Sequence, residues 1–214
     1  MPIVLSTKVL PLKLKRHLFA ANIDLVEYNA IKIERLDINF PKTHFENAIF
    51  TSQNATKLAF EKDLTFENVF CVGKKTEALL ALQNIKTNLV ADNAEQLAKK
   101  IVNTYPHKSF DFFCSAQRRE ELPDLLSDYK IEFREHHLYQ SVLNRKTFAN
   151  DFDAVLCFSP MGVKAYYENH TLQPTAICIG ETTASEARRF TSNFLISTKT
   201  SLESVIVKAV KVLK

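Results

Sequence analysis

The sequence predicts an α/β protein built from two similar domains, each a parallel β-sheet covered by helices. Two observations lead to this fold class. Short apolar, strand-like runs alternate with amphipathic helical stretches along the chain. In addition, several residues recur at one fixed offset, which indicates an internal repeat. The 214 residues are enough for one large domain or two small ones.

The apolar runs are predicted to be strands because turn-forming or polar residues bound each of them. The predicted strands are Ile3–Ser6, Ala48–Ser52, Val69–Val72, Asn88–Ala91, Phe110–Cys114, Ala154–Phe158, Ala176–Ile179 and Phe194–Ser197. Among the stretches between and after them, Ala94–Thr104 and Leu202–Leu213 have apolar residues at helical spacing and are predicted to be helices.

An internal duplication is visible in pairs of identical residues that lie 107 positions apart. These pairs are Ser52 and Ser159, Lys57 and Lys164, Cys71 and Cys178, Gly73 and Gly180, and Thr76 and Thr183. Asn93 and Thr200, each predicted to open a later helix, keep the same offset. Because no insertion interrupts the match, we infer that the chain contains two copies of one α/β unit.

The two copies predict a discontinuous domain. After its three strand–helix units, the first copy has a fourth strand–helix unit. The second copy has no such unit after its third helix, and the N-terminal segment of the chain resembles the missing unit. Domain 1 is therefore expected to comprise residues 1–36 and 144–214, and domain 2 the insert 40–138. The crossing segments, about 26–36 and 133–144, alternate like extended strands and are predicted to form a two-stranded connector.

Composition argues against several classes of protein. The net charge of +4 comes from basic residues scattered among acids, whereas nucleic-acid binders carry a clustered basic stripe. The four cysteines lack the CxxC spacing of zinc and redox sites, and we expect buried, reduced thiols at Cys71, Cys114, Cys157 and Cys178. Three glycines are too few for a glycine-rich phosphate loop or a dinucleotide fingerprint.

The location expected from the sequence is the cytoplasm. No apolar run reaches the roughly 18–20 residues of a membrane span. The N-terminus lacks the basic start and the small-residue cleavage site of a signal peptide. We expect a monomer with no membrane or nucleic-acid partner.

Small hydroxyl residues follow the predicted strands, where ligands of an open parallel sheet bind. They are Ser6, Thr7, Ser52, Thr76, Ser115, Ser159, Thr182 and Thr183. Such a residue caps its helix through the side-chain oxygen. A cap uses only one or two of the four free N–H groups, so the others, with the helix dipole, remain able to hold carboxylates. The sequence therefore predicts a cleft between the two domains with several anion sites, suited to a large polyanion.

Conventional catalytic motifs are absent from the sequence, including the GxSxG and HExxH patterns. The histidines are expected at the surface, with a role for His136 or His137 left open. Arg118 and Arg119 fit either a solvated first helical turn or a clamp for a carboxylate. A site made mainly of backbone donors, holding a reactive substrate in one shape, fits these residues best.

An ordered series of segments resembles the motifs of the uroporphyrinogen-III synthase family. They are FTSQNATK, FCVGKKTEALL, NAEQLAKKIV, FFCSAQRREELPDLL, LYQSVLN, LCFSPMGVKAYYE and ICIGETTASEARR. The resemblance implies a lyase of tetrapyrrole and haem (porphyrin) synthesis that converts hydroxymethylbilane to uroporphyrinogen III. In that reaction the terminal hydroxyl leaves ring A, ring D attacks to give a spiro intermediate, and re-closure inverts ring D. It implies no cofactor and no metal.

The resemblance also assigns roles to residues. Tyr139 matches the family tyrosine thought to assist loss of the hydroxyl. The implied substrate-binding positions are Lys8, Ser52, Thr76, Ser159, Met161, Thr182 and Thr183. Met161 stands where the family commonly has serine, so a hydroxyl contact is lost there. Ser115 and Ala116 replace a Gly-Asn pair, which changes the contacts of that loop.

Two other functions stay open from the sequence. A non-catalytic, bilobed binding protein for a polycarboxylate would have the same fold. Tyr139 and the absence of an export signal favour the enzyme over this alternative. An enzyme that uses one domain to bind a nucleotide is disfavoured by the scarcity of glycine.

Overall fold

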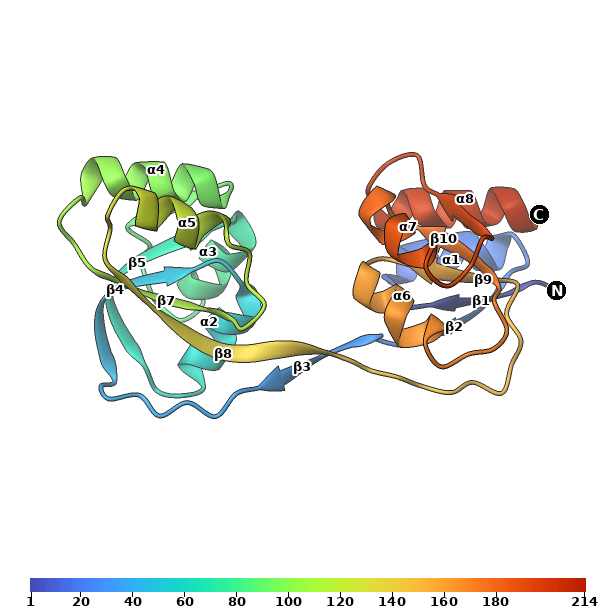
Figure 1. Ribbon diagram of the computed structural model, residues 1–214, viewed down its shortest axis with the longest axis horizontal. Helices are drawn as coiled ribbons and strands as arrows, with labels where there is room; N and C mark the ends of the chain where they lie inside the picture. The colour runs from blue at the N-terminus through green and yellow to red at the C-terminus, as the bar shows by residue number, and fades with distance from the viewer. The chain divides into compact units, whose positions relative to one another are not determined.

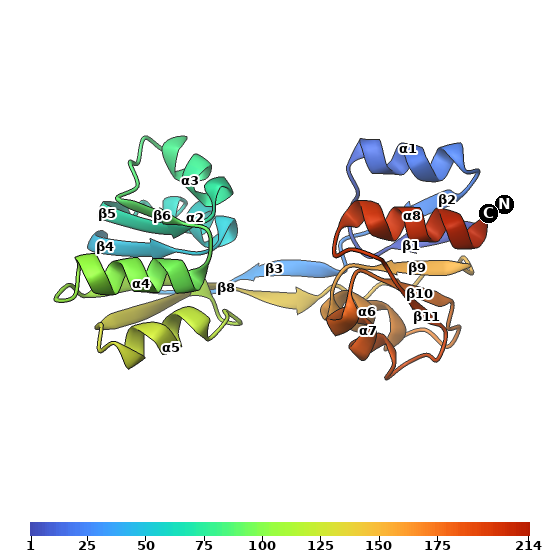
Figure 2. The same cartoon turned by 90° about the horizontal axis from the view of Figure 1, so that it is seen from above.

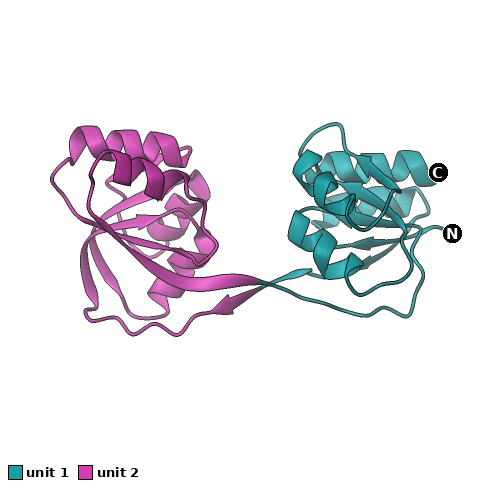
Figure 3. Cartoon of the chain, viewed as in Figure 1, with its two compact units in different colours: residues 1–32, 142–214 teal, residues 33–141 magenta.

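The structure is a computed structural model that describes residues 1–214, and the chain forms two compact units (Figures 1 and 3). Unit 1 comprises Met1–Lys32 and Val142–Lys214, and unit 2 comprises Ile33–Ser141. Each unit is built on one sheet with parallel central strands, which agrees with the predicted fold class. No helix is both long and apolar enough to cross a membrane.

Unit 1 has a five-stranded sheet of order β11-β10-β9-β1-β2. Its strands are β1 (Ile3–Ser6), β2 (Asp24–Glu27), β9 (Ala154–Cys157), β10 (Thr175–Cys178) and β11 (Phe194–Ile196). Helices α1 (Leu12–Ala20) and α8 (Leu202–Leu213) share a core cluster with Val4, and α6 (Pro160–Tyr167) and α7 (Glu181–Ala187) share another with Leu5. Successive strand residues point to opposite faces, so the two helix pairs cover opposite faces of the sheet (Figure 2).

Unit 2 has a six-stranded sheet of order β3-β8-β7-β4-β5-β6. Its strands are β3 (Ile31–Arg35), β4 (His44–Phe50), β5 (Thr65–Val72), β6 (Leu89–Ala91), β7 (Phe110–Ser115) and β8 (Phe133–Leu143). Helices α2 (Gln53–Phe60) and α3 (Lys74–Ala81) pack on the face of Phe50 and Cys71. Helices α4 (Ala94–Thr104) and α5 (Glu121–Asp128) pack on the face of Ile49 and Phe70.

The internal repeat is visible in the order of the strands. At the offset of 107 residues, β4, β5 and β6 correspond to β9, β10 and β11. With β7 and β8 matched to β1 and β2, the five matched strands have the same spatial order in both sheets, and β3 is an additional edge strand of unit 2. In each sheet the connections run in opposite directions from one pair of neighbouring strands, β4 and β7 in unit 2 and β9 and β1 in unit 1. Such a switch point is where open α/β sheets bind ligands.

Each predicted strand overlaps an observed one, and α4 and α8 have the predicted limits. The largest differences are at β4 and β5, which begin four residues before the predicted strands, at His44 and Thr65. In these added segments every second residue is polar and exposed, for example Glu46 and Glu67, because only the alternate side chains enter the core. The apolar runs therefore mark only the fully buried halves of the two strands.

Two predicted features are different in the structure. The segment 26–36 is not one strand: β2 ends at Glu27, the N–H groups of Tyr28 and Ala30 donate to carbonyls at the end of β1 and just after it, and β3 begins at Ile31. The residue that caps α8 is Ser201, whose Oγ accepts the N–H of Ser204 at 3.2 Å, and not Thr200. The repeat therefore slips by one residue at this helix.

Candidate active site

A cavity of about 490 Å³ lies at the switch point of unit 2. It is bounded by residues at or just after the ends of β4, β6 and β7 and by residues of β8, including Ser52, Asn93, Ser115, Arg118, Arg119 and Tyr139. We call it the Tyr139 cavity. Its position at the carboxyl ends of the strands is the one that the fold predicts for a ligand site.

A β-bulge places Tyr139 in this cavity. In the pairing of β7 with β8, Cys114 lies opposite His137 but Ser115 lies opposite Tyr139, so Leu138 is left without a partner. As a result, the consecutive residues Leu138 and Tyr139 pack into the same core cluster, on the side of α2, instead of pointing to opposite faces. The N–H of Ala116 donates to the Tyr139 carbonyl at 2.8 Å and holds the backbone there.

The Tyr139 hydroxyl lies 2.8 Å from Ser52 Oγ. Tyr139 is only 6% exposed, and this contact joins the middle of β8 to the start of α2. Ser52 is the N-cap of α2, and its Oγ accepts the N–H groups of Asn54 at 3.2 Å and Ala55 at 3.4 Å. The serine therefore has both the capping role and a direct contact with the predicted catalytic residue.

The charged groups of the Tyr139 cavity are partly paired. Arg118 donates to Glu135 Oε1 from Nε at 2.9 Å and from a terminal nitrogen at 2.7 Å, and it also pairs with Glu120. Burial raises the pKa of Glu135, but the hydrogen bonds from Arg118 and His137 outweigh it and lower the pKa overall. Arg119 is exposed and forms no ion pair, so it is the cation at this cavity that remains free for an anion.

Cys114, Glu135 and His137 offer ligand atoms within 4.8 Å of one another. However, Glu135 already binds Arg118 and lies 2.7 Å from His137 Nε2. Burial, together with the Glu135 charge, raises the pKa of the Cys114 thiol to about 12, whereas metals bind the thiolate. These residues fit a hydrogen-bonded structural cluster better than a metal centre.

A second cavity, of about 570 Å³, lies between the N-termini of α2 and α3. Three lysines line it, Lys57, Lys74 and Lys75; no acidic residue does, and none of the three forms an ion pair. We call it the lysine cavity. It shares Thr51, Ser52 and Val72 with the Tyr139 cavity, so the two adjoin.

The start of α3 leaves backbone donors free in the lysine cavity. The helix follows Gly73, which has no side chain to cap it, and Thr76 lies buried in the first turn. Gly73 has φ of 86°, a left-handed conformation that glycine adopts at little cost and other residues rarely adopt. Uncapped N–H groups at a helix start attract anions, and three lysines add to that attraction.

The predicted site residues of unit 1 lie at the equivalent edge of its own sheet. Ser159 caps α6 and accepts the N–H of Gly162 at 3.0 Å, with the half-buried Met161 in the same turn. Thr182 is exposed and Thr183 is buried in the first turn of α7. Lys8 is exposed after β1. The sequence-equivalent glycines differ in conformation, because Gly180 has φ of −176°, an extended backbone open to any residue.

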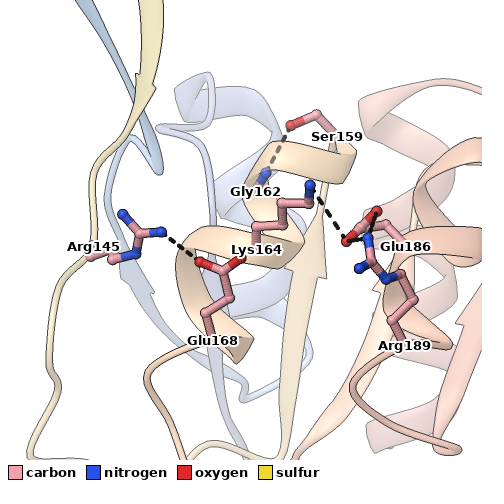
Figure 4. A network of polar contacts seen from close by, with 7 residues as sticks. All are labelled: Arg145, Ser159, Gly162, Lys164, Glu168, Glu186 and Arg189. Carbon is pink, nitrogen blue, oxygen red and sulfur yellow. Dashed lines mark hydrogen bonds and ion pairs between the residues drawn. The ribbon is translucent and has the colours of Figure 1, made fainter.

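Side chains of unit 1 contact and pair with one another near its switch point. Thr7 Oγ1 donates to the Leu156 carbonyl at 2.8 Å, and a Cβ at Gly162 would lie 3.0 Å from that same Thr7 oxygen. Lys164, the counterpart of Lys57, lies 3.9 Å from Glu186, which also accepts from Arg189 at 3.1 Å (Figure 4). Lys164 of unit 1 therefore faces an acidic side chain, whereas its counterpart in unit 2, Lys57, does not.

The structure brings together three predicted site residues of unit 2, Ser52, Thr76 and Tyr139, around two adjoining cavities. Sequence reasoning did not select Lys57, Lys74, Lys75 or Arg119 as site residues. Lys57 could have been selected because it is one of the residues repeated at the offset of 107 positions. The lysine pair directly after Gly73 was also visible, but its lack of acidic partners could be seen only in the folded chain.

Comparisons with known proteins agree with this geometry. Residues 13–206 match the family described as "Uroporphyrinogen-III synthase HemD". The fold is similar to that of uroporphyrinogen-III synthetase from Helicobacter pylori, with a TM-score of 0.70, 18% identity, and coverage of 99% of this chain and 100% of the other. It is also similar to a mutant uroporphyrinogen III synthase from Thermus thermophilus, with a TM-score of 0.56, 11% identity, and coverage of 99% and 98%. No curated protein matches the chain in sequence.

Proposed function

Because the chain belongs to the uroporphyrinogen-III synthase family, a family of lyases, we propose that it converts hydroxymethylbilane to uroporphyrinogen III in haem and related tetrapyrrole synthesis. The observation that carries the proposal is the Tyr139 hydroxyl in a cavity at the switch point of unit 2, beside a second cavity lined by lysines. Nothing in the comparisons favours the non-catalytic polycarboxylate binder.

In the proposed mechanism, Tyr139 acts as the proton donor for loss of the terminal hydroxyl. The bond between the ring A methylene carbon and oxygen breaks, the electron pair goes to oxygen, and oxygen takes the Tyr139 proton and leaves as water. The substrate is left with a positive charge that its pyrrole nitrogen shares. Ring D then attacks through its substituted carbon to give the spiro intermediate. The older bond from that carbon to the ring C methylene breaks, and the freed methylene bonds to the unsubstituted α-carbon of ring D, which leaves ring D inverted. The proton that the product finally loses restores Tyr139.

Substrate carboxylates are proposed to bind at the helix starts. In unit 2 the lysine cavity offers Lys57, Lys74, Lys75 and the first turn of α3 with Thr76. Arg119 offers a further unpaired cation at the Tyr139 cavity. In unit 1 we propose contacts with Lys8, Ser159, Met161, Thr182 and Thr183, where α7 starts without a side-chain cap. Binding of the flexible chain in one folded shape supplies the orientation that ring inversion needs.

The chain is proposed to act in the cytoplasm as a monomer on a small-molecule substrate, without a nucleic-acid partner. All four cysteines are free and buried, as is usual for proteins of a reducing compartment. We also propose that units 1 and 2 are the two domains of the enzyme, with unit 2 inserted into a discontinuous unit 1.

The test is the isomer ratio of the porphyrins formed from hydroxymethylbilane. Without enzyme the bilane closes to the uninverted type I isomer. We expect type III to dominate when the protein is present. A mixture that stays type I at every protein concentration, with the protein folded by circular dichroism, would refute the proposed function.

A further inference from the structure

We infer that Ser52 is a positioning residue for Tyr139: its hydroxyl donates to Tyr139 Oη and so directs the tyrosine proton into the cavity. The inference rests on the proposed function, in which Tyr139 gives its proton to the departing hydroxyl. It assigns Ser52 a role through Tyr139 instead of the contact with substrate that the family resemblance implies.

The direction of the hydrogen bond follows from the other contacts of Ser52. A serine oxygen has two lone pairs and one hydrogen. The N–H groups of Asn54 and Ala55 both point at Ser52 Oγ, at 3.2 and 3.4 Å, and occupy its lone pairs. The remaining bond, 2.8 Å long, joins Ser52 Oγ to Tyr139 Oη. The serine hydrogen remains to make it, which favours Ser52 as the donor and Tyr139 as the acceptor.

This arrangement leaves the Tyr139 hydrogen without a protein partner. Tyr139 Oη makes no hydrogen bond other than that with Ser52. Because Tyr139 lines the cavity, its own hydrogen can point toward a bound substrate. The geometry therefore prepares the tyrosine to donate, which an opposite orientation, with Tyr139 donating to Ser52, would prevent.

The same bond stabilises the tyrosine after its proton has left. When the substrate oxygen takes the proton and leaves as water, Tyr139 Oη becomes a phenolate. Ser52 then makes a charge-assisted hydrogen bond to it, and such bonds are about twice as strong as neutral ones. The N-terminus of α2 lies behind Ser52, so its dipole also favours the negative charge. The bulge in β8 is what brings Tyr139 within reach of this helix start.

The test is a double-mutant cycle between Ser52 and Tyr139, followed by turnover and KM for type III formation. Tyr139→Phe is expected to lower kcat about 100-fold, since general acids contribute about 10²–10⁴-fold. Ser52→Ala is expected to lower kcat about tenfold and leave KM within about twofold. The double variant should have the kcat of Tyr139→Phe alone, because Ser52 acts only through the tyrosine hydroxyl.

Three further variants separate this role from helix capping. Ser52→Thr keeps both the cap and the donor and should restore most of the turnover. Ser52→Asp keeps the cap but can only accept from Tyr139, so its kcat should fall at least as far as that of Ser52→Ala while thermal stability is retained. Ser201→Ala removes an equivalent cap from α8 and should lower the unfolding temperature by about 2–4 °C with turnover unchanged.

The outcomes decide between Ser52 as a positioning residue and Ser52 as a substrate contact. If Ser52→Ala raises KM instead of lowering kcat, or lowers kcat further in the Tyr139→Phe background, or if Ser52→Asp turns over like the wild type, the inference fails. The proposed function survives each of these results as long as the wild-type product is type III. Full turnover by Tyr139→Phe would instead remove the proton-donor role of Tyr139, and the role of Ser52 with it.

Discussion

Units 1 and 2 have the same arrangement of strands and helices but differ at the carboxyl ends of their strands, the edge at which open α/β sheets bind ligands. The capping serine recurs as Ser52 and Ser159, and the order of the strands is the same. Even the helix C-terminal pairs recur, because Glu61 binds Arg35 and Glu168 binds Arg145, both at 2.6 Å. These shared features stabilise helices. Their contribution to the helices does not depend on what either unit binds.

The charge at the two edges is what differs. Lys57 is free in unit 2, whereas Lys164 faces Glu186 in unit 1; the position in unit 2 that corresponds to Glu186 holds Leu79, which cannot pair with a lysine. Lys74 likewise corresponds to Glu181, which binds Arg188. The capping serine of unit 2 forms a hydrogen bond with Tyr139, whereas that of unit 1 forms no hydrogen bond with a tyrosine. We therefore propose that unit 2 carries the proton donor and attracts anions more strongly than unit 1.

The largest expected effect comes from removing one tyrosine hydroxyl in each unit. Tyr139→Phe should lower kcat about 100-fold with substrate affinity little changed. Tyr28→Phe is the matched variant in unit 1, where the hydroxyl is buried without a hydrogen-bond partner. It should leave kcat unchanged and raise the free energy of unfolding by about 1 kcal/mol, since an unpaired polar group leaves the core. Turnover assays and thermal unfolding of both variants measure this, and equal losses of turnover would remove the functional difference between the units.

A smaller effect is expected from the lysines. The triple variant Lys57→Gln, Lys74→Gln and Lys75→Gln should raise KM about tenfold and weaken the dependence of KM on salt, because free cations attract the carboxylates of the substrate. Lys164→Gln is the control, since that lysine already faces Glu186. KM measured across a range of ionic strength tests this. A similar rise in KM for both variants would show that the difference in pairing has no part in binding.

The smallest effects are expected at the threonines of the helix starts. Thr76→Ala in unit 2 and Thr182→Ala in unit 1 should each weaken binding and turnover by a few-fold, about the contribution of one neutral hydrogen bond. The measurement is kcat/KM for each variant and for the double variant. If only Thr76→Ala has an effect, the first turn of α7 has no part in the reaction.

Residue patterns predicted the order of strands and helices well, because these patterns reflect which side chains are buried. Strand and helix periodicities reflect which side chains are buried, so the alternation of elements and the limits of α4 and α8 could be read directly. The repeated Ser52 and Ser159 indicated helix starts because capping is a local interaction. Prediction was weaker for β4 and β5, where half of the side chains are exposed and the apolar run is broken.

The sequence by itself determined the α/β class, the duplication and the family, since these depend on patterns along the chain. Only the tertiary structure decided how the site is assembled. The bulge opposite Ser115 directs the Tyr139 side chain toward Ser52, a residue 87 positions away. No pattern among the neighbouring residues predicts this bulge. Whether a lysine is free depends likewise on a partner from another helix, as Lys57 and Lys164 show. Contacts between segments distant in sequence exist only once the sheet has brought those segments together.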